Sequence, residues 1–246
     1  MRHLALLCCL AALHFPARAA CQTGLAERLH ANLTRKGALL PELAVCDAWR
    51  GHLGRSVVVL PTPGSIADTI DLDVLVVQQP DNGNSERATV LAQWRQTVRN
   101  GGRDALSVSD IELDGARYRL SPDLRSFGLR IIRRSTAMQQ PASSETLSVY
   151  SLGRGNQLHL MLDELETRRE RGQWGPGCSG RFEKQESQVT VSRSSTSRGL
   201  ADLLVERTDA RSVNELQGEE CVESIEPPRY SETTLRFDGS AYRSAD

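Results

Sequence analysis

The side chains that could do chemistry in this sequence are few and widely spaced. Outside the first 20 residues the histidines are His30, His52 and His159, which are far apart and form no H-E-x-x-H pattern for zinc. Asp71 and Asp73 are two residues apart in a strand-like run, so both carboxylates would lie on one side of a strand. We expect them to face solvent on an exposed strand face, and we expect no metal and no cofactor.

Two loops have compositions that could support ion binding or catalysis, but neither has the required order. Residues 81–86 carry oxygen donors, yet they lack the D-x-[DN]-x-[DN]-G spacing of a calcium loop. Ser179 lies in the sequence Gly177-Cys178-Ser179-Gly180, which does not match the G-x-S-x-G turn of a serine hydrolase. We therefore expect no catalytic residues. A hydrolase would have to gather carboxylates from distant strands, and it is the least favoured function.

One aromatic residue, Trp174, is a candidate for binding a partner. It lies in a loop that glycine and proline residues make rigid, close to Cys178. A preorganised aromatic side chain of this kind could anchor a protein or a glycan. The alternative, which the sequence favours, is that Trp174 packs as core against a disulfide bridge formed by Cys178.

The cysteines indicate a covalent framework. Removal of the first 19 residues would leave four cysteines, and an even number in an exported protein is typical of disulfide bonding. Three pairings are possible. We favour Cys21–Cys46 and Cys178–Cys221, because the cysteines form two distant pairs and lack the close spacing of a metal site.

Residues 1–19 have the features of a signal peptide for export. The apolar run at residues 4–13 is too short to span a membrane, which takes about 20 residues. Arg18 stands where a lipoprotein signal has an aliphatic residue, so lipid attachment at Cys21 is not favoured. The sequence thus predicts a periplasmic or secreted protein with no transmembrane segment.

We expect the exported protein to begin at Ala20 or Cys21, because the small residues Ala17 and Ala19 mark the cleavage site. The intact mass of the protein purified from the periplasm tests this expectation. A mass that retains residues 1–19, or one that includes a diacylglycerol adduct on Cys21, would contradict it.

The overall composition narrows the classes of partner. The 246 residues are 39% hydrophobic and 25% charged, which is compatible with a folded core, and the formal net charge is −1. A charge this balanced provides no general affinity for nucleic acid or anionic membranes. Only 4% of the residues are aromatic, so aliphatic side chains must fill most of the core.

Hydrophobic periodicity predicts one short helix followed by many strands. Residues 22–40 have leucines at helical spacing, whereas later segments are short apolar or alternating runs bounded by turns. Residues 89–94 fit either a strand or a short helix. The expected fold is all-β, mainly an antiparallel β meander that forms a sandwich or a propeller-like body. The other expected strands are residues 56–60, 70–77, 111–113, 118–120, 127–132, 147–150, 158–162, 189–191, 200–205 and 233–237.

An internal similarity suggests that the β domain contains two related units. The run at residues 70–76 is similar to that at 199–205, and Asp-Gly turns at 114–115 and 238–239 are each followed by a tyrosine that would return to the core. The expected organisation is a signal peptide (1–19), a helical segment (20–42) and a β domain (43–246), with units of about 43–132 and 133–246.

Seven short stretches carry a resemblance to known proteins. They are Cys46–Trp49, Asp71–Val76, Tyr118–Pro122, Phe127–Arg130, Gly172–Trp174, Cys178–Phe182 and Leu235–Gly239. Together they resemble a group of uncharacterised exported β-rich proteins of Gram-negative bacteria. The resemblance covers about residues 43–243. It implies an envelope protein of β architecture, and it carries no catalytic residues over.

These expectations favour a non-enzymatic exported protein that acts as a binding or inhibitor-type module. The expected disulfides, the Trp174 loop and the missing catalytic set support this function. A structural or assembly factor of the envelope is the alternative, and it would expose a sheet edge or an apolar patch. The expected partner is an envelope protein or a glycan, and not nucleic acid.

Overall fold

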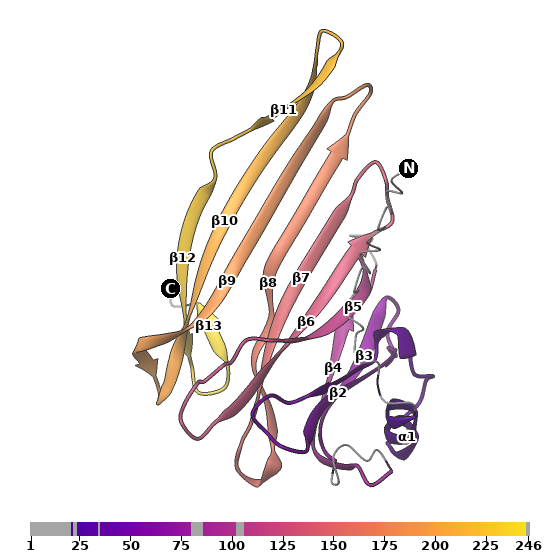
Figure 1. Cartoon of the computed structure of the whole chain (residues 1–246), viewed down its shortest axis with the longest axis vertical. Helices are drawn as coiled ribbons and strands as arrows, with labels where there is room; N and C mark the ends of the chain where they lie inside the picture. The colour runs from indigo at the N-terminus through magenta and orange to yellow at the C-terminus, as the bar shows by residue number, and fades with distance from the viewer. Residues whose placement is uncertain (1–20, 22–23, 34, 80–85, 102–105, 245–246) are drawn as a thin grey trace, which may run out of the picture.

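A computed structural model describes residues 21, 24–33, 35–79, 86–101 and 106–244 of the chain. The strands form two antiparallel sheets, and one short helix, α1 (Leu25–Asn32), precedes them (Figure 1). The predicted all-β fold with an N-terminal helix is therefore confirmed. Residues 89–94, which fitted either a strand or a helix, lie in a strand.

The first sheet contains four strands in sequential order, and α1 covers its outer face. Leu25 and Leu29 of the helix pack against Val58 and Leu75 of the sheet, because the apolar stripe of the helix faces the strands. A 3₁₀ turn (Pro41–Leu43) connects the helix to the sheet. The strands are β1 (Val45–Ala48), β2 (Arg55–Pro63), β3 (Thr69–Gln78) and β4 (Thr89–Arg99).

The second sheet contains nine strands, of which eight follow the order β13-β12-β10-β9-β8-β7-β6-β5, while β11 pairs with β10. Its middle strands are unusually long for a globular protein, in which strands are usually 3–10 residues. The strands are β5 (Leu106–Asp114), β6 (Arg125–Ser135), β7 (Ala142–Leu152), β8 (Leu158–Trp174), β9 (Gly180–Ser197), β10 (Leu200–Gln217), β11 (Glu220–Ile225), β12 (Arg229–Phe237) and β13 (Tyr242–Ser244).

The largest core lies between the two sheets and makes this part of the molecule a sandwich. Val57 and Leu72 of the first sheet share it with Ile111, Phe127 and Leu129 of the second sheet, and all five side chains are buried. Alternate residues of β6 point into this core, as the period of two in a strand requires.

A second core contains the tyrosines that follow the two Asp-Gly turns. Tyr118 and Tyr242 are both buried, together with Leu147 and Leu203, so their expected return to the core is confirmed. The hydroxyl of Tyr242 donates a hydrogen bond to the carbonyl oxygen of Ala201 at 2.5 Å.

The strand expected at residues 118–120 is wrong. Tyr118 and Leu120 are buried and Arg119 between them is exposed, which is the alternation that suggested a strand, but the segment is irregular and pairs with none of the described strands. The backbone amide of Ala201 donates to the carbonyl oxygen of Leu120 at 2.7 Å and holds the segment in place.

The two sheets divide between β4, which ends at Arg99, and β5, which begins at Leu106. The expected division into units near residue 132 lies instead inside β6, so the sheets do not coincide with those units. The similarity between residues 70–76 and 199–205 reflects local strand and turn patterns. Such local patterns do not determine which strands pair with each other.

Candidate functional site

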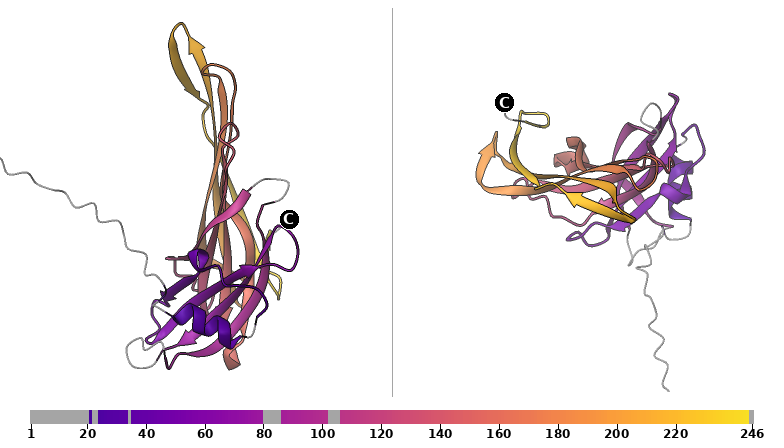
Figure 2. Two further views of the ribbon diagram at one scale, coloured as in Figure 1. Left: turned by 90° about the vertical axis from the view of Figure 1, so that its right-hand side faces the viewer. Right: turned by 90° about the horizontal axis from the view of Figure 1, so that it is seen from above.

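The upper part of the second sheet extends beyond the sandwich as a single layer (Figures 1 and 2). We call this part the extension, and it comprises residues 168–174, 180–188, 206–217, 220–225 and 229–232 of strands β8 to β12. None of its residues belongs to the three hydrophobic cores that the described residues form. Both faces of the extension are therefore available to a partner.

Strand pairing places all the large exposed apolar side chains of the extension on one face, which we call the Trp174 face. Paired residues on neighbouring strands point to the same side, and residues two apart along a strand do so as well. Phe182 on β9 pairs with Ser212 on β10, which pairs with Ile225 on β11. Likewise, Glu186 on β9 pairs with Thr208 on β10, which pairs with Tyr230 on β12. The exposed members of this face are Trp174 (42% exposed), Leu216 (60%), Ile225 (72%) and Tyr230 (76%).

Trp174 is not part of a core, so the interpretation that the sequence favoured is wrong. Its indole packs edge-on against the ring of Phe182, with ring centroids 4.8 Å apart, and its outer part is exposed. Gly180 permits this contact, because a Cβ atom there would lie only 3.0 Å from Trp174 Cε3. The sequence could not show this exposure, since it depends on the absence of a second layer over the described strands.

Both favoured disulfide pairings, Cys21–Cys46 and Cys178–Cys221, are confirmed. The second bridge joins the β8–β9 turn to the start of β11 at the far end of the extension. It therefore stabilises strands that have no second layer, next to Trp174 and Leu216.

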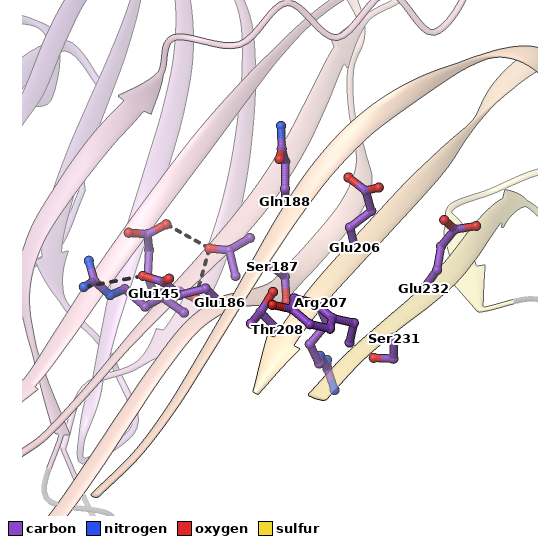
Figure 3. Close-up of a pocket in the computed structure, with 12 residues that line it drawn as sticks. Glu145, Glu186, Ser187, Gln188, Glu206, Arg207, Thr208, Ser231 and Glu232 are labelled. Carbon is purple, nitrogen blue, oxygen red and sulfur yellow. Dashed lines mark hydrogen bonds and ion pairs between the residues drawn. The ribbon is translucent and has the colours of Figure 1, made fainter. Parts of the chain in front are cut away.

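A groove of about 760 Å³ lies lower on the extension (Figure 3). It opens where β8 and β9 separate: their pairing ends at Arg168 and Glu186, although β9 continues to pair with β10. A row of paired residues crosses the groove, and it comprises Glu145, Arg168, Glu186, Thr208 and Tyr230.

The electrostatics of the groove favour a cation. Glu206 and Glu232 are direct cross-strand neighbours on β10 and β12, an arrangement in which like charges repel. Neither carboxylate has a base within 4 Å in the described part of the chain. By contrast, Glu186 is paired with Lys184 Nζ at 2.9 Å, so its charge is offset within the protein.

The opposite side of the extension, which we call the Arg171 face, has different chemistry. It carries more bases than acids and none of the large exposed apolar side chains of the extension. Its charged residues within the paired strands are Arg169, Arg171, Arg181, Arg207, Arg211 and Arg229, together with Glu183, Asp209, Glu215 and Glu220.

The paired aspartates of β3 do lie on one side of the strand, but the expectation that they face solvent is wrong. Asp71 is 6% exposed and Asp73 is 1% exposed. Arg95 bridges both carboxylates, and Arg35 binds Asp73 Oδ1 at 3.0 Å. Thr97 donates a 2.5 Å hydrogen bond to Asp71. All oxygens of the pair are thus used internally, and the cluster is structural.

The remaining candidate residues do not come together. His30 binds the carbonyl oxygen of Gly37, His52 packs on Trp49 and His159 is exposed on β8. Within the described ranges no group of three or more histidine, cysteine or acidic side chains could hold a metal ion. Most of the loop at 81–86 lies outside the described residues.

Comparisons with known proteins add no assignment, since no family model, no curated protein and no solved structure matches the chain. Among the described residues there is no helix with the length and apolar character needed to cross a membrane.

Proposed function

We propose that this is an exported, non-enzymatic binding protein, and that the Trp174 face docks a protein partner. The observation that carries the proposal is the position of Trp174, Leu216, Ile225 and Tyr230 on one face of a single-layer sheet. Several large exposed apolar side chains on one face of a sheet without a second layer favour an interaction surface. The two disulfides support a location outside the cytoplasm, in the periplasm or beyond.

The chemistry of the face indicates the kind of partner. Aromatic and aliphatic anchors near the end of the extension favour an apolar segment. The unpaired Glu206 and Glu232 beside Tyr230 favour basic side chains next to that segment, because a cation would remove their mutual repulsion. A protein segment that combines apolar and basic residues satisfies both requirements, whereas a neutral glycan would leave the two charges unpaired.

The replacement of Tyr230 and Ile225 by serine should reduce partner binding by about 5- to 30-fold per residue, since central anchors contribute about 1–2 kcal/mol each. Both side chains are more than two-thirds exposed and outside the cores, so the fold should be retained. The measurement is chemical cross-linking of the purified protein in an envelope extract, followed by identification and titration of the captured protein.

Arg171→Ser is the matched control, because Arg171 is exposed on the opposite face of the same strands. Wild type and this control should capture the same abundant protein, and the Tyr230 and Ile225 variants should lose it. Equal capture by all variants, or turnover of a substrate by the protein, would contradict the proposed function.

A further inference from the structure

A second hollow, separate from the extension, lies at one end of the sandwich. It has a volume of about 240 Å³ and lies between the β1–β2 loop and the irregular segment before β6. Arginines line it from both sides, namely Arg50, Arg117, Arg119 and Arg125.

Ion pairs within the described residues do not offset the charges of these arginines. None of the four has a carboxylate within 4 Å among the residues that the structure describes. Asp114 also lines the hollow, but it is already bound by the Tyr118 hydroxyl, by Arg130 at 3.2 Å and by the Ala116 amide. Asp47, the other acid of the lining, accepts a hydrogen bond from the Ala48 amide at its exposed position.

The walls of the hollow are held firmly. Trp49 is buried and packs edge-on against Phe127, with ring centroids 5.4 Å apart. The ring of His52 packs on that of Trp49, with ring centroids 4.3 Å apart, and the His52 backbone amide donates a hydrogen bond to the Trp49 carbonyl oxygen. Across the hollow the guanidinium of Arg50 lies next to Gly115, since a Cβ atom at that glycine would be in ordinary van der Waals contact with Arg50 Nη1 at 3.7 Å. A site on such supports requires little reorganisation to bind a ligand.

We propose that this hollow binds a phosphate monoester, with the phosphate held by the arginines and its carrier group resting against the His52 and Trp49 wall. A guanidinium presents paired N–H groups that match phosphate oxygens, and several guanidiniums require a ligand with more than one negative charge. The hollow is too small for a polymer to be enclosed, but it can hold a phosphate and part of a sugar-sized group. This site does not depend on the proposed function of the Trp174 face.

The electrostatics around His52 are consistent with an anion site. Burial lowers the pKa of His52 below its ordinary value, and the charges of Arg125 and Arg55 lower it further. The positive potential of the hollow therefore acts on a neighbouring titratable group. A bound phosphate should offset this potential and raise the pKa of His52.

The test is calorimetric titration with glucose 6-phosphate, with glucose as the uncharged control. The wild-type protein should bind glucose 6-phosphate and not glucose, and binding should weaken as ionic strength rises. The double variant Arg117→Gln/Arg125→Gln should raise the dissociation constant at least 10-fold, whereas Arg171→Gln on the extension should leave it unchanged. These arginines are exposed, so circular dichroism should show an unchanged fold.

Nuclear magnetic resonance titration of His52 gives a second readout, in which glucose 6-phosphate should raise its pKa in the wild type but not in the double variant. Vesicles that contain phosphatidic acid distinguish the source of the phosphate. Binding of glucose 6-phosphate alone supports a soluble ester, and additional binding of the vesicles supports a phosphorylated lipid headgroup. Binding of neither, or equal binding by the double variant, would overturn the proposal.

Discussion

Replacing Asp73 with alanine should lower the free energy of unfolding by about 3 kcal/mol, because it removes the carboxylate that Arg35 binds and leaves Arg95 with Asp71 alone. Asp73 is 1% exposed and accepts from Arg35 at 3.0 Å and from Arg95 at 2.9 Å. Both arginines are about a third exposed, so solvent screens part of the loss and the effect belongs at the lower end of the range for buried pairs. Urea unfolding of the two proteins measures the difference.

The control for this prediction is Asp123→Ala, because Asp123 is exposed and has no ion pair among the described residues. Its replacement should change the stability by less than about 0.5 kcal/mol. An Asp73→Ala protein as stable as the Asp123→Ala protein would show that the cluster contributes nothing.

The same cluster should make the free energy of unfolding depend on pH in the acidic range. Burial raises the pKa of Asp71, but hydrogen bonds from Thr97 and Arg95 and the charge of Arg95 lower it more, so the pKa lies below the ordinary 3.8. A carboxyl group with a depressed pKa in the folded state stabilises the protein above its unfolded pKa. This contribution is lost as the pH falls from about 4 through the folded pKa.

Removal of the second disulfide in Cys178→Ser/Cys221→Ser should cost about 2–4 kcal/mol, the range for native bridges that close loops of this length. The effect should be concentrated in the extension, because the bridge joins the β8–β9 turn to β11, and no second layer supports these strands. Hydrogen exchange should therefore accelerate in the upper parts of β8, β9 and β10, while β3 and β6 in the sandwich keep their protection.

The variant Cys21→Ser/Cys46→Ser is the comparison, since its bridge joins the residues before α1 to the first sheet. It should accelerate exchange near α1 and leave the extension unchanged. Identical exchange of the extension in all three proteins would contradict the stabilising role of Cys178–Cys221.

Much of the fold could be predicted because it depends on local patterns. The β-branched runs in β2 and β3, the turn residues between strands and the sequence-local cysteine pairs all report neighbouring parts of the chain. The burial of Asp71 and Asp73 could not be predicted in this way. Their partners are Arg35, which precedes Asp73 by 38 residues, and Arg95 on the next strand, so only tertiary packing brings them together.

The candidate site was predictable only in part. The sequence singled out Trp174, but it did not indicate Leu216, Ile225 or Tyr230, because their shared face follows from the register of the five strands β8 to β12. The long polar runs in β8, β9 and β10 are the one available signal. Strands without a regular apolar face have no core to cover, and such strands form a single layer.

The single-layer extension has a thermal consequence for the protein. The heat capacity change of unfolding arises mainly from apolar surface that becomes exposed, and the hydrophobic cores lie elsewhere in the described chain. The sandwich and the second core therefore account for most of the curvature in the plot of the free energy of unfolding against temperature. The extension instead holds its shape through backbone hydrogen bonds and one covalent bridge, and its enthalpy of opening should change little between cold and warm conditions.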